Sequence, residues 1–107
     1  MSGMDFNKML EQVQEMQTQM QKAQEELKDE TVQATAGGGM VTVTATGGGE
    51  IREIKIDPKA IDPNDPEMLE DLVVAAINEA LRSAQGLMEA KLGPALGGLH
   101  GLGLPGM

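Results

Sequence analysis

Apolar side chains recur at alternating steps of three and four residues along the first thirty positions of the chain. They occupy Phe6, Met9, Val13, Met16, Met20, Ala23 and Leu27. This is the spacing of the a and d positions of a heptad repeat, and it predicts an uninterrupted helix over residues 6–30. Most other side chains in this segment are Gln, Glu, Lys or Asp, so only one narrow stripe requires burial.

The predicted helix is long for a chain of 107 residues. At about 1.5 Å of rise per residue it would measure roughly 37 Å, which is more than a small sheet can cover. Its apolar stripe has two interpretations: it packs only on the chain's own second helix, or it also pairs with a second copy of the chain. The length of the helix and the narrowness of the stripe favour the second copy.

The pattern changes to period two in residues 31–56, where Val, Ala and Ile alternate with Thr and other polar residues. This alternation predicts three short strands in an antiparallel meander. Glycine triplets at 37–39 and 47–49 separate the strands and suit tight turns that need a positive φ. Ile54 and Ile56 keep the alternation of the third strand whereas Ile51 breaks it, which indicates a β-bulge or an edge contact.

A connector with three Asp-Pro pairs leads from the strands to a second helix. Pro66 suits the first helical position, with Asp65 as the N-cap. A broad apolar face predicts that this helix runs to about residue 92, covers the sheet and continues beyond it. Gly, Leu and Pro dominate from Gly93 on, so we expect a flexible tail over residues 93–107. The fold class is α+β, with one α-β-β-β-α domain over residues 1–92.

Composition gives a further reason to expect a second subunit. Phe6 is the only aromatic residue, so Met, Leu, Val, Ile and Ala must build the core. Such a thin core in a short chain points to burial between subunits, because aromatic side chains usually bury about 150–250 Å² each. The candidate dimer-interface residues are Phe6, Met9, Val13, Met16, Met20, Val41 and Val43.

The chain carries a formal net charge of −9, from 17 acidic and 8 basic residues. This counts against a nucleic-acid partner, because phosphate contacts by Lys and Arg supply much of the affinity of such proteins. The absence of Cys excludes disulfides and thiolate metal sites and suits the cytoplasm. The longest apolar run, residues 72–77, is far short of the ~20 residues that span a bilayer, so no membrane contact is expected.

Catalytic, cofactor and metal chemistry find no support in the sequence. Gly101-x-Gly103-x-x-Gly106 matches a dinucleotide fingerprint as a string, but no strand precedes it and no helix follows. The acidic residues between 57 and 67 lack the spacing of a calcium loop, and Asp-Pro turns explain them. His100 is the only histidine and has nothing to orient it as a general base. We therefore expect no enzyme activity, cofactor, metal ion or small-molecule substrate.

Three segments, taken with the order of the elements, resemble one family. They are MQTQMQKAQEEL at 16–27, IKIDP at 54–58 and MLEDLVVAAINEA at 68–80. Over residues 5–92 the chain resembles the YbaB/EbfC family of bacterial nucleoid-associated proteins. The resemblance implies a homodimer shaped like tweezers, in which the first and last helices project as arms from a body that contains the sheets.

The resemblance also implies binding to double-stranded DNA with little or modest sequence preference, in the cytoplasmic nucleoid, with an effect on nucleoid organisation. The arm helices are implicated in that binding. The candidate DNA-binding residues carried over by position are Lys8, Lys22, Lys28, Arg82 and Lys91. Glu11 and Thr18 stand where members often have lysine, so we expect weak binding that depends strongly on salt.

A chaperone-like or scaffold module is the alternative function. Helical arms with an apolar, Met-rich stripe also suit the gripping of polypeptide, and the net charge of −9 favours this interpretation. Protection of an unfolding client from aggregation, without retention of DNA, would distinguish it from a DNA-binding protein.

Overall fold

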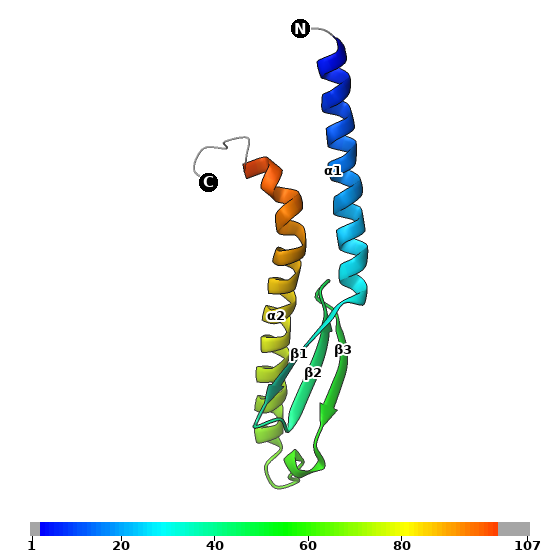
Figure 1. Cartoon of the computed structure of the whole chain (residues 1–107). Coiled ribbons are helices and arrows are strands. Elements are labelled where there is room, and N and C mark those ends of the chain that lie inside the picture. The colour runs from blue at the N-terminus through cyan, green and yellow to red at the C-terminus, as the bar shows by residue number, and fades with distance from the viewer. Residues whose placement is uncertain (1–2, 101–107) are drawn as a thin grey trace.

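The structure is a computed structural model that describes residues 3–100, with side chains described for residues 6–93. Its elements are α1 (Gly3–Asp29), β1 (Thr31–Ala36), β2 (Val41–Thr46), β3 (Ile51–Ile56), the short 3-10 helix η1 (Pro58–Ala60) and α2 (Pro66–His100). The molecule is elongated, with extents of 76 × 29 × 16 Å, because α1 runs away from the small sheet while α2 lies across it (Figure 1). The predicted α+β order of helix, meander and helix is confirmed.

The sheet has the strand order β1-β2-β3, and both pairs are antiparallel. Thr44 pairs with Glu53 but the next residue, Ala45, pairs with Ile51. Arg52 is therefore the extra residue of a β-bulge, which shifts Ile51 out of the alternation kept by the rest of β3. The bulge indicated by the sequence is confirmed.

The two glycine triplets serve different purposes. All three residues of the first turn, Gly37, Gly38 and Gly39, have a positive φ, as expected for a tight hairpin. In the second triplet only Gly49 does, with φ at 89°. Gly47 is instead buried where the end of α1 crosses the sheet, and a Cβ there would lie 2.5 Å from Cδ2 of Leu27. This second requirement, for close approach, was not part of the sequence prediction.

The core lies between one face of the sheet and α2. Its buried residues are Ala34, Val41, Val43, Ala45, Ala76, Ala80 and Ala84. The small side chains of α2 let the helix backbone approach the strands closely, which explains how a chain with one aromatic residue forms a core. Val41 and Val43 have no exposed surface in the single chain. This corrects their assignment to a dimer interface, because side chains already covered by α2 have no area left for a partner.

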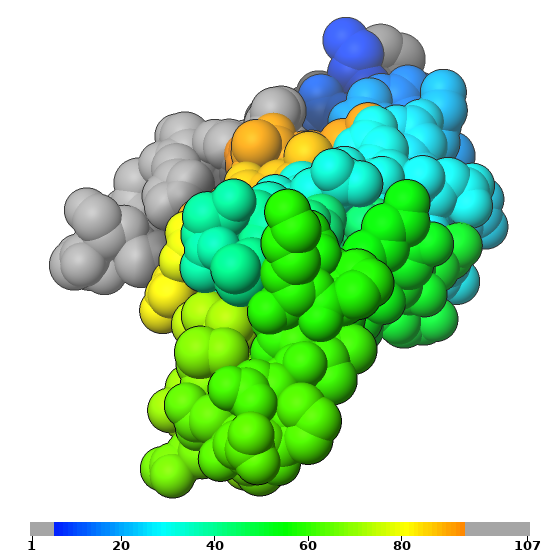
Figure 2. All heavy atoms as spheres, turned by 90° about the horizontal axis from the view of Figure 1, so that it is seen from below, coloured from blue at the N-terminus to red at the C-terminus, as the bar shows by residue number. Residues whose placement is uncertain are grey.

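The third strand extends beyond the cover that α2 provides. Ile54 pairs with Val43 and Ile56 with Val41, so both isoleucines lie on the face that carries the core. They are nevertheless 40% and 37% exposed. A helix is about 10 Å wide and strands lie about 4.8 Å apart, so α2 covers mainly β1 and β2, and on β3 it is Ile51 that still packs against the core. Figure 2, seen from below, shows β3 and the following connector at the surface.

Helix α2 begins as predicted and ends later than predicted. The Asp65 carboxylate accepts a hydrogen bond from the backbone N–H of Met68 at 3.3 Å, which confirms it as the N-cap. The helix continues to His100, eight residues beyond the expected end near residue 92. Ala and Leu in this stretch favour a helix, and Pro94 costs one backbone hydrogen bond and permits a bend, which Figure 1 shows near the end of α2. The rest of the expected tail, residues 101–107, lies outside the described residues.

Candidate nucleic-acid interface

Helix α1 is packed against the body at its C-terminal end, and at its N-terminal end the side chains that the structure describes are exposed. Leu27, near its C-terminal end, is 2% exposed and packs at Gly47. Met20 and Met16 are half-buried, and from Val13 towards the N-terminus every described side chain is exposed. Figure 1 shows that the N-terminal half of α1 extends beyond the end of α2. The predicted apolar stripe is therefore used within the chain over its second half only.

Three of the predicted DNA-binding lysines lie on this helix. Lys8, Lys22 and Lys28 are exposed, and no ion pair is found for them among the described side chains. At about 100° of rotation per residue, Lys8 and Lys22 lie on the same side of α1, with Glu15 midway between them. Lys28 lies about 120° around the helix from Lys22. The structure thus presents the three lysines to solvent but does not gather them into one patch.

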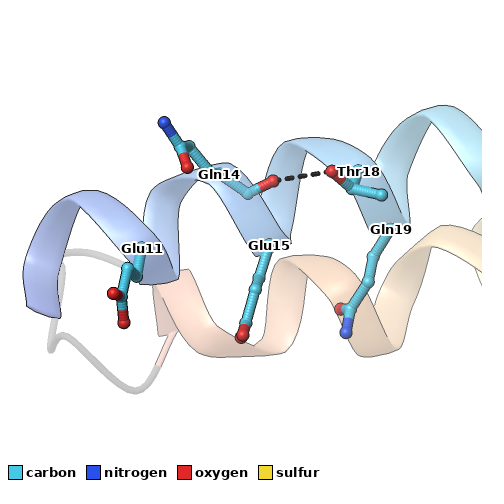
Figure 3. Close-up of a pocket in the computed structure, with 5 residues that line it drawn as sticks. All are labelled: Glu11, Gln14, Glu15, Thr18 and Gln19. Atoms are coloured by element: carbon cyan, nitrogen blue, oxygen red, sulfur yellow. Dashed lines mark hydrogen bonds between the residues drawn. The ribbon is translucent and has the colours of Figure 1, made fainter.

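The surface between the lysines is mixed in charge. A shallow, open depression of about 480 Å³ is lined by Glu11, Gln14, Glu15, Thr18 and Gln19, all from α1 (Figure 3). The Thr18 hydroxyl donates to the carbonyl oxygen of Gln14 at 2.9 Å, so it is occupied within the helix. Gln amides can donate to phosphate oxygens, whereas the two carboxylates repel them. The depression is too open to enclose a ligand, and its two carboxylates oppose close contact with a polyanion between the lysines.

Lys91 is engaged in an ion pair between the two helices. Its Nζ lies 2.7 Å from Oε2 of Glu26 and 2.7 Å from Oε1 of Glu30, and its side chain is 26% exposed. The hydrogen bonds from Lys91 lower the pKa of the Glu26 carboxyl, and those to both carboxylates raise the pKa of Lys91. Lys91 therefore links α2 to the C-terminal end of α1. The two carboxylates neutralise its charge, although the sequence predicted that Lys91 would contact phosphate.

Arg82 lies on the exposed surface of α2 and is also paired. Its Nη2 donates to Oε2 of Glu79 at 2.7 Å, one turn earlier on the same helix. Both side chains are more than half exposed, so this pair is weak and leaves the guanidinium accessible. A phosphate contact by Arg82 stays a prediction, although Glu79 reduces the net positive charge around the guanidinium.

One cation near the α1 lysines was missed by the sequence reasoning. Arg52, the extra residue of the bulge, donates from Nη2 to the backbone carbonyl of Lys28 at 2.9 Å. A bulge re-aims the side chain of its extra residue, and a cation at a helix C-terminus complements the helix dipole. The break at Ile51 predicted the bulge, but the direction of the Arg52 side chain depends on how α1 meets the sheet.

Among the residues that the structure describes, no group of three or more His, Cys, Asp or Glu side chains is arranged to hold a metal ion. No helix within the described part of the chain is long and apolar enough to cross a membrane.

Known proteins are similar to this chain in sequence and in fold. The model of the YbaB/EbfC DNA-binding family matches residues 1–99. The chain belongs to this family. The resemblance seen in the three sequence segments is thereby confirmed, and membership places the chain in a family of DNA-binding, nucleoid-associated proteins rather than of enzymes.

Individual YbaB/EbfC relatives align over nearly the whole chain. A nucleoid-associated protein of Acetivibrio thermocellus is 50% identical over 105 residues, covering 98% of this chain and 91% of the relative. A nucleoid-associated protein of Streptomyces avermitilis is 50% identical over 103 residues, covering 96% and 91%. The crystal structure of an uncharacterized protein from Helicobacter pylori is similar with a TM-score of 0.59 at 26% identity, covering 69% of this chain and 86% of that one.

Proposed function

We propose that this YbaB/EbfC family member binds double-stranded DNA with little sequence specificity, as a homodimer, and contributes to the organisation of the nucleoid. The observation that carries the proposal is helix α1, whose N-terminal half projects from the body and along which Lys8, Lys22 and Lys28 are exposed. The description of the family as DNA-binding and the nucleoid-associated names of the relatives support it.

The proposed contact is electrostatic and reads the DNA backbone rather than the bases. Lysines on α1 bind phosphate, and Arg52 beside Lys28 adds a guanidinium whose other donors remain available. Gln side chains between them orient the arm on the backbone without specifying sequence. With three lysines on each of two arms, log K falls against log salt with a slope of about −5, since each phosphate contact contributes about −0.9.

The homodimer is proposed to form at the uncovered part of the sheet. Ile54 and Ile56 on β3 and Ile61 in the connector are exposed by 37% to 55%. They lie beside a free strand edge, which offers unpaired backbone groups to a second chain. Cover from a second copy would bury these isoleucines and leave both α1 arms free. This surface replaces Val41 and Val43 of the sequence prediction with the isoleucines of the neighbouring strand.

A gel-shift titration at several salt concentrations tests the DNA proposal. The Lys8→Gln/Lys22→Gln variant removes two charges from the arm, and Lys55→Gln/Lys59→Gln removes the same charge near the other end of the molecule. We expect the first pair to weaken binding clearly more than the second. An equal loss in both variants would refute the arm as the site, because only net charge would then matter. Absence of wild-type binding at every salt concentration would refute the function.

The chaperone-like alternative rests on one observation, the exposed apolar side chains near the N-terminus of α1. Phe6 and Met9 are 60% and 58% exposed. An unfolding client that is protected from aggregation by the chain, in the absence of any DNA retention, would favour this alternative over DNA binding.

A further inference from the structure

The N-terminal part of α1 carries an apolar surface that the described part of the chain leaves uncovered. We name it the tip stripe, and it consists of Phe6, Met9, Leu10 and Val13. The exposed fractions are 60%, 58%, 47% and 47%, in that order. Figure 1 shows this segment of α1 beyond the end of α2. Four large apolar side chains on one side of an otherwise polar helix mark an interaction surface.

The tip stripe continues a pattern that is used for helix packing elsewhere in the same helix. Phe6, Met9 and Val13 occupy the a and d positions of the heptads whose last member, Leu27, is buried at the sheet. Sustained a and d spacing is the pattern of a helix that packs lengthwise against another helix. The stripe is about 10 Å long from residue 6 to residue 13, at ~1.5 Å per residue, so a short helical segment would cover it.

The residues that flank the tip stripe include a single charge, Asp5 at the first g position. The other e and g positions along it are Leu10, Gln12, Gln17 and Gln19, while Lys8, Glu11 and Glu15 lie further round the helix. Charges at e and g decide which helices pair, because like charges across them repel. Flanks with so few charges permit pairing with a second copy of the chain, although each copy has a net charge of −9. The helix most complementary to this surface is therefore another copy of itself.

We propose that the tip stripe pairs in antiparallel orientation with the tip stripe of a second α1, and that this contact joins homodimers to one another. In antiparallel helices the same flank of each helix meets across the two-fold axis, so the two Leu10 side chains lie together. In parallel helices the e position of Leu10 would instead face the g position of residue 5, which is an aspartate in the sequence. The antiparallel arrangement also places opposite ends of the helix dipoles side by side. Each homodimer carries two stripes, so pairing produces closed tetramers or open chains.

Sedimentation equilibrium without DNA tests this contact apart from the proposed function. Val13→Glu places a charge in the stripe, and Gln14→Glu adds the same charge next to it on the outer side of α1. We expect wild type and Gln14→Glu to form species larger than dimers as concentration rises. Val13→Glu should stop at the dimer, with association at the tip weakened roughly tenfold or more. Equal size distributions for wild type and Val13→Glu would overturn the proposal.

Two other results separate the tip contact from the proposals above. If Val13→Glu turns a wild-type dimer into a monomer, tip pairing is supported and the dimer surface on β3 is wrong. If wild type and Val13→Glu remain the same size and only wild type binds lipid vesicles or an unfolded polypeptide, the tip stripe has another occupant and the inference is overturned. Gel shifts with Val13→Glu and Gln14→Glu measure DNA binding separately from tip pairing, since the two variants carry the same net charge.

Disulfide trapping tests the orientation, because the chain contains no Cys. Under mild oxidation Leu10→Cys should form a disulfide-linked pair rapidly, whereas Glu11→Cys on the outer side should not. Phe6→Cys is also expected to react slowly, since the antiparallel register places it beside residue 15 or 16 of the other copy. Fast linkage of Phe6→Cys together with slow linkage of Leu10→Cys would indicate parallel helices and overturn the antiparallel pairing.

Discussion

The junction between α1 and the sheet depends on the absence of a side chain at Gly47. The residue is buried, and its N–H donates to the carbonyl oxygen of Glu30 at 2.9 Å. A Cβ at this position would lie 2.5 Å from Cδ2 of Leu27, 3.1 Å from Cδ2 of Leu87 and 3.2 Å from the backbone oxygen of Leu27. All three distances are shorter than ordinary van der Waals contact, so Gly47→Ala must displace the buried Leu27 side chain and shift the helix or the loop slightly.

The size of the effect follows from two opposing terms. Overpacking of a well-packed site costs about 1–3 kcal/mol. Replacing Gly by Ala restricts the unfolded chain and returns about 0.4–1 kcal/mol. We therefore expect Gly47→Ala to destabilise the fold by roughly 0.5–2 kcal/mol. The neighbouring Gly48→Ala meets only Oγ1 of Thr46 at 3.6 Å, and its φ is not positive, so it should be neutral or slightly stabilising.

Urea and thermal unfolding of the two variants measure this difference. All samples must have the same protein concentration, since stability depends on concentration if the chain dimerises. For domains of this size a loss of 1 kcal/mol lowers Tm by about 4–8 °C. Gly47→Ala should thus unfold several degrees below Gly48→Ala. A Tm for Gly47→Ala equal to or above that of Gly48→Ala would show that Leu27 does not restrict this position.

Three further outcomes are expected from the arm, the ion pair and the core. Glu15→Lys completes a row of lysines along one side of α1 and should strengthen DNA binding and steepen its salt slope by about 0.9 per arm in gel shifts. Lys91→Met should lower Tm at pH 7 more than at pH 3, because the pKa of the Glu26 carboxyl is held below 4.5 and its stabilising contribution is lost as the pH falls. An unchanged difference at pH 3 would exclude Glu26 from that role. Ala80→Val should destabilise by about 1–3 kcal/mol in urea unfolding, whereas Ala75→Val on the exposed side should change little; equal losses would exclude close packing of α2.

The fold was predictable from the sequence because each element has a strong local pattern. The heptad spacing predicted α1, the alternation predicted the strands, and Asp65 with Pro66 predicted the start of α2. Even the irregularity was local, since Ile51 alone broke the phase of β3 and marked the bulge. The end of α2 was missed because Gly93 and Pro94 are helix breakers by propensity, while the helix in fact continues past them.

The site was less predictable because it depends on contacts between residues far apart in the chain. Glu30 and Lys91 are 61 residues apart, and their ion pair appears only when α2 crosses the end of α1. Arg52 reaches Lys28 across 24 residues for the same reason. Val43 follows the strand alternation correctly, but the alternation does not say whether α2 or another subunit covers that face. Sequence patterns identify which side chains need cover, and the packing of the elements decides what covers them.

The net charge of −9 opposes DNA binding less than its size suggests, because many acidic residues lie far from the proposed DNA-binding arm of this elongated molecule. Between residues 6 and 22 of α1 there are two lysines and two glutamates, so the free arm itself is neutral. Acidic residues gather in the connector and the first turns of α2, which Figure 1 shows at the far end from the tip of α1. The long axis measures 76 Å, whereas charges in physiological salt are screened over about 8 Å. DNA on the arm therefore experiences the local lysines, glutamates and glutamines rather than the acidic end of the molecule.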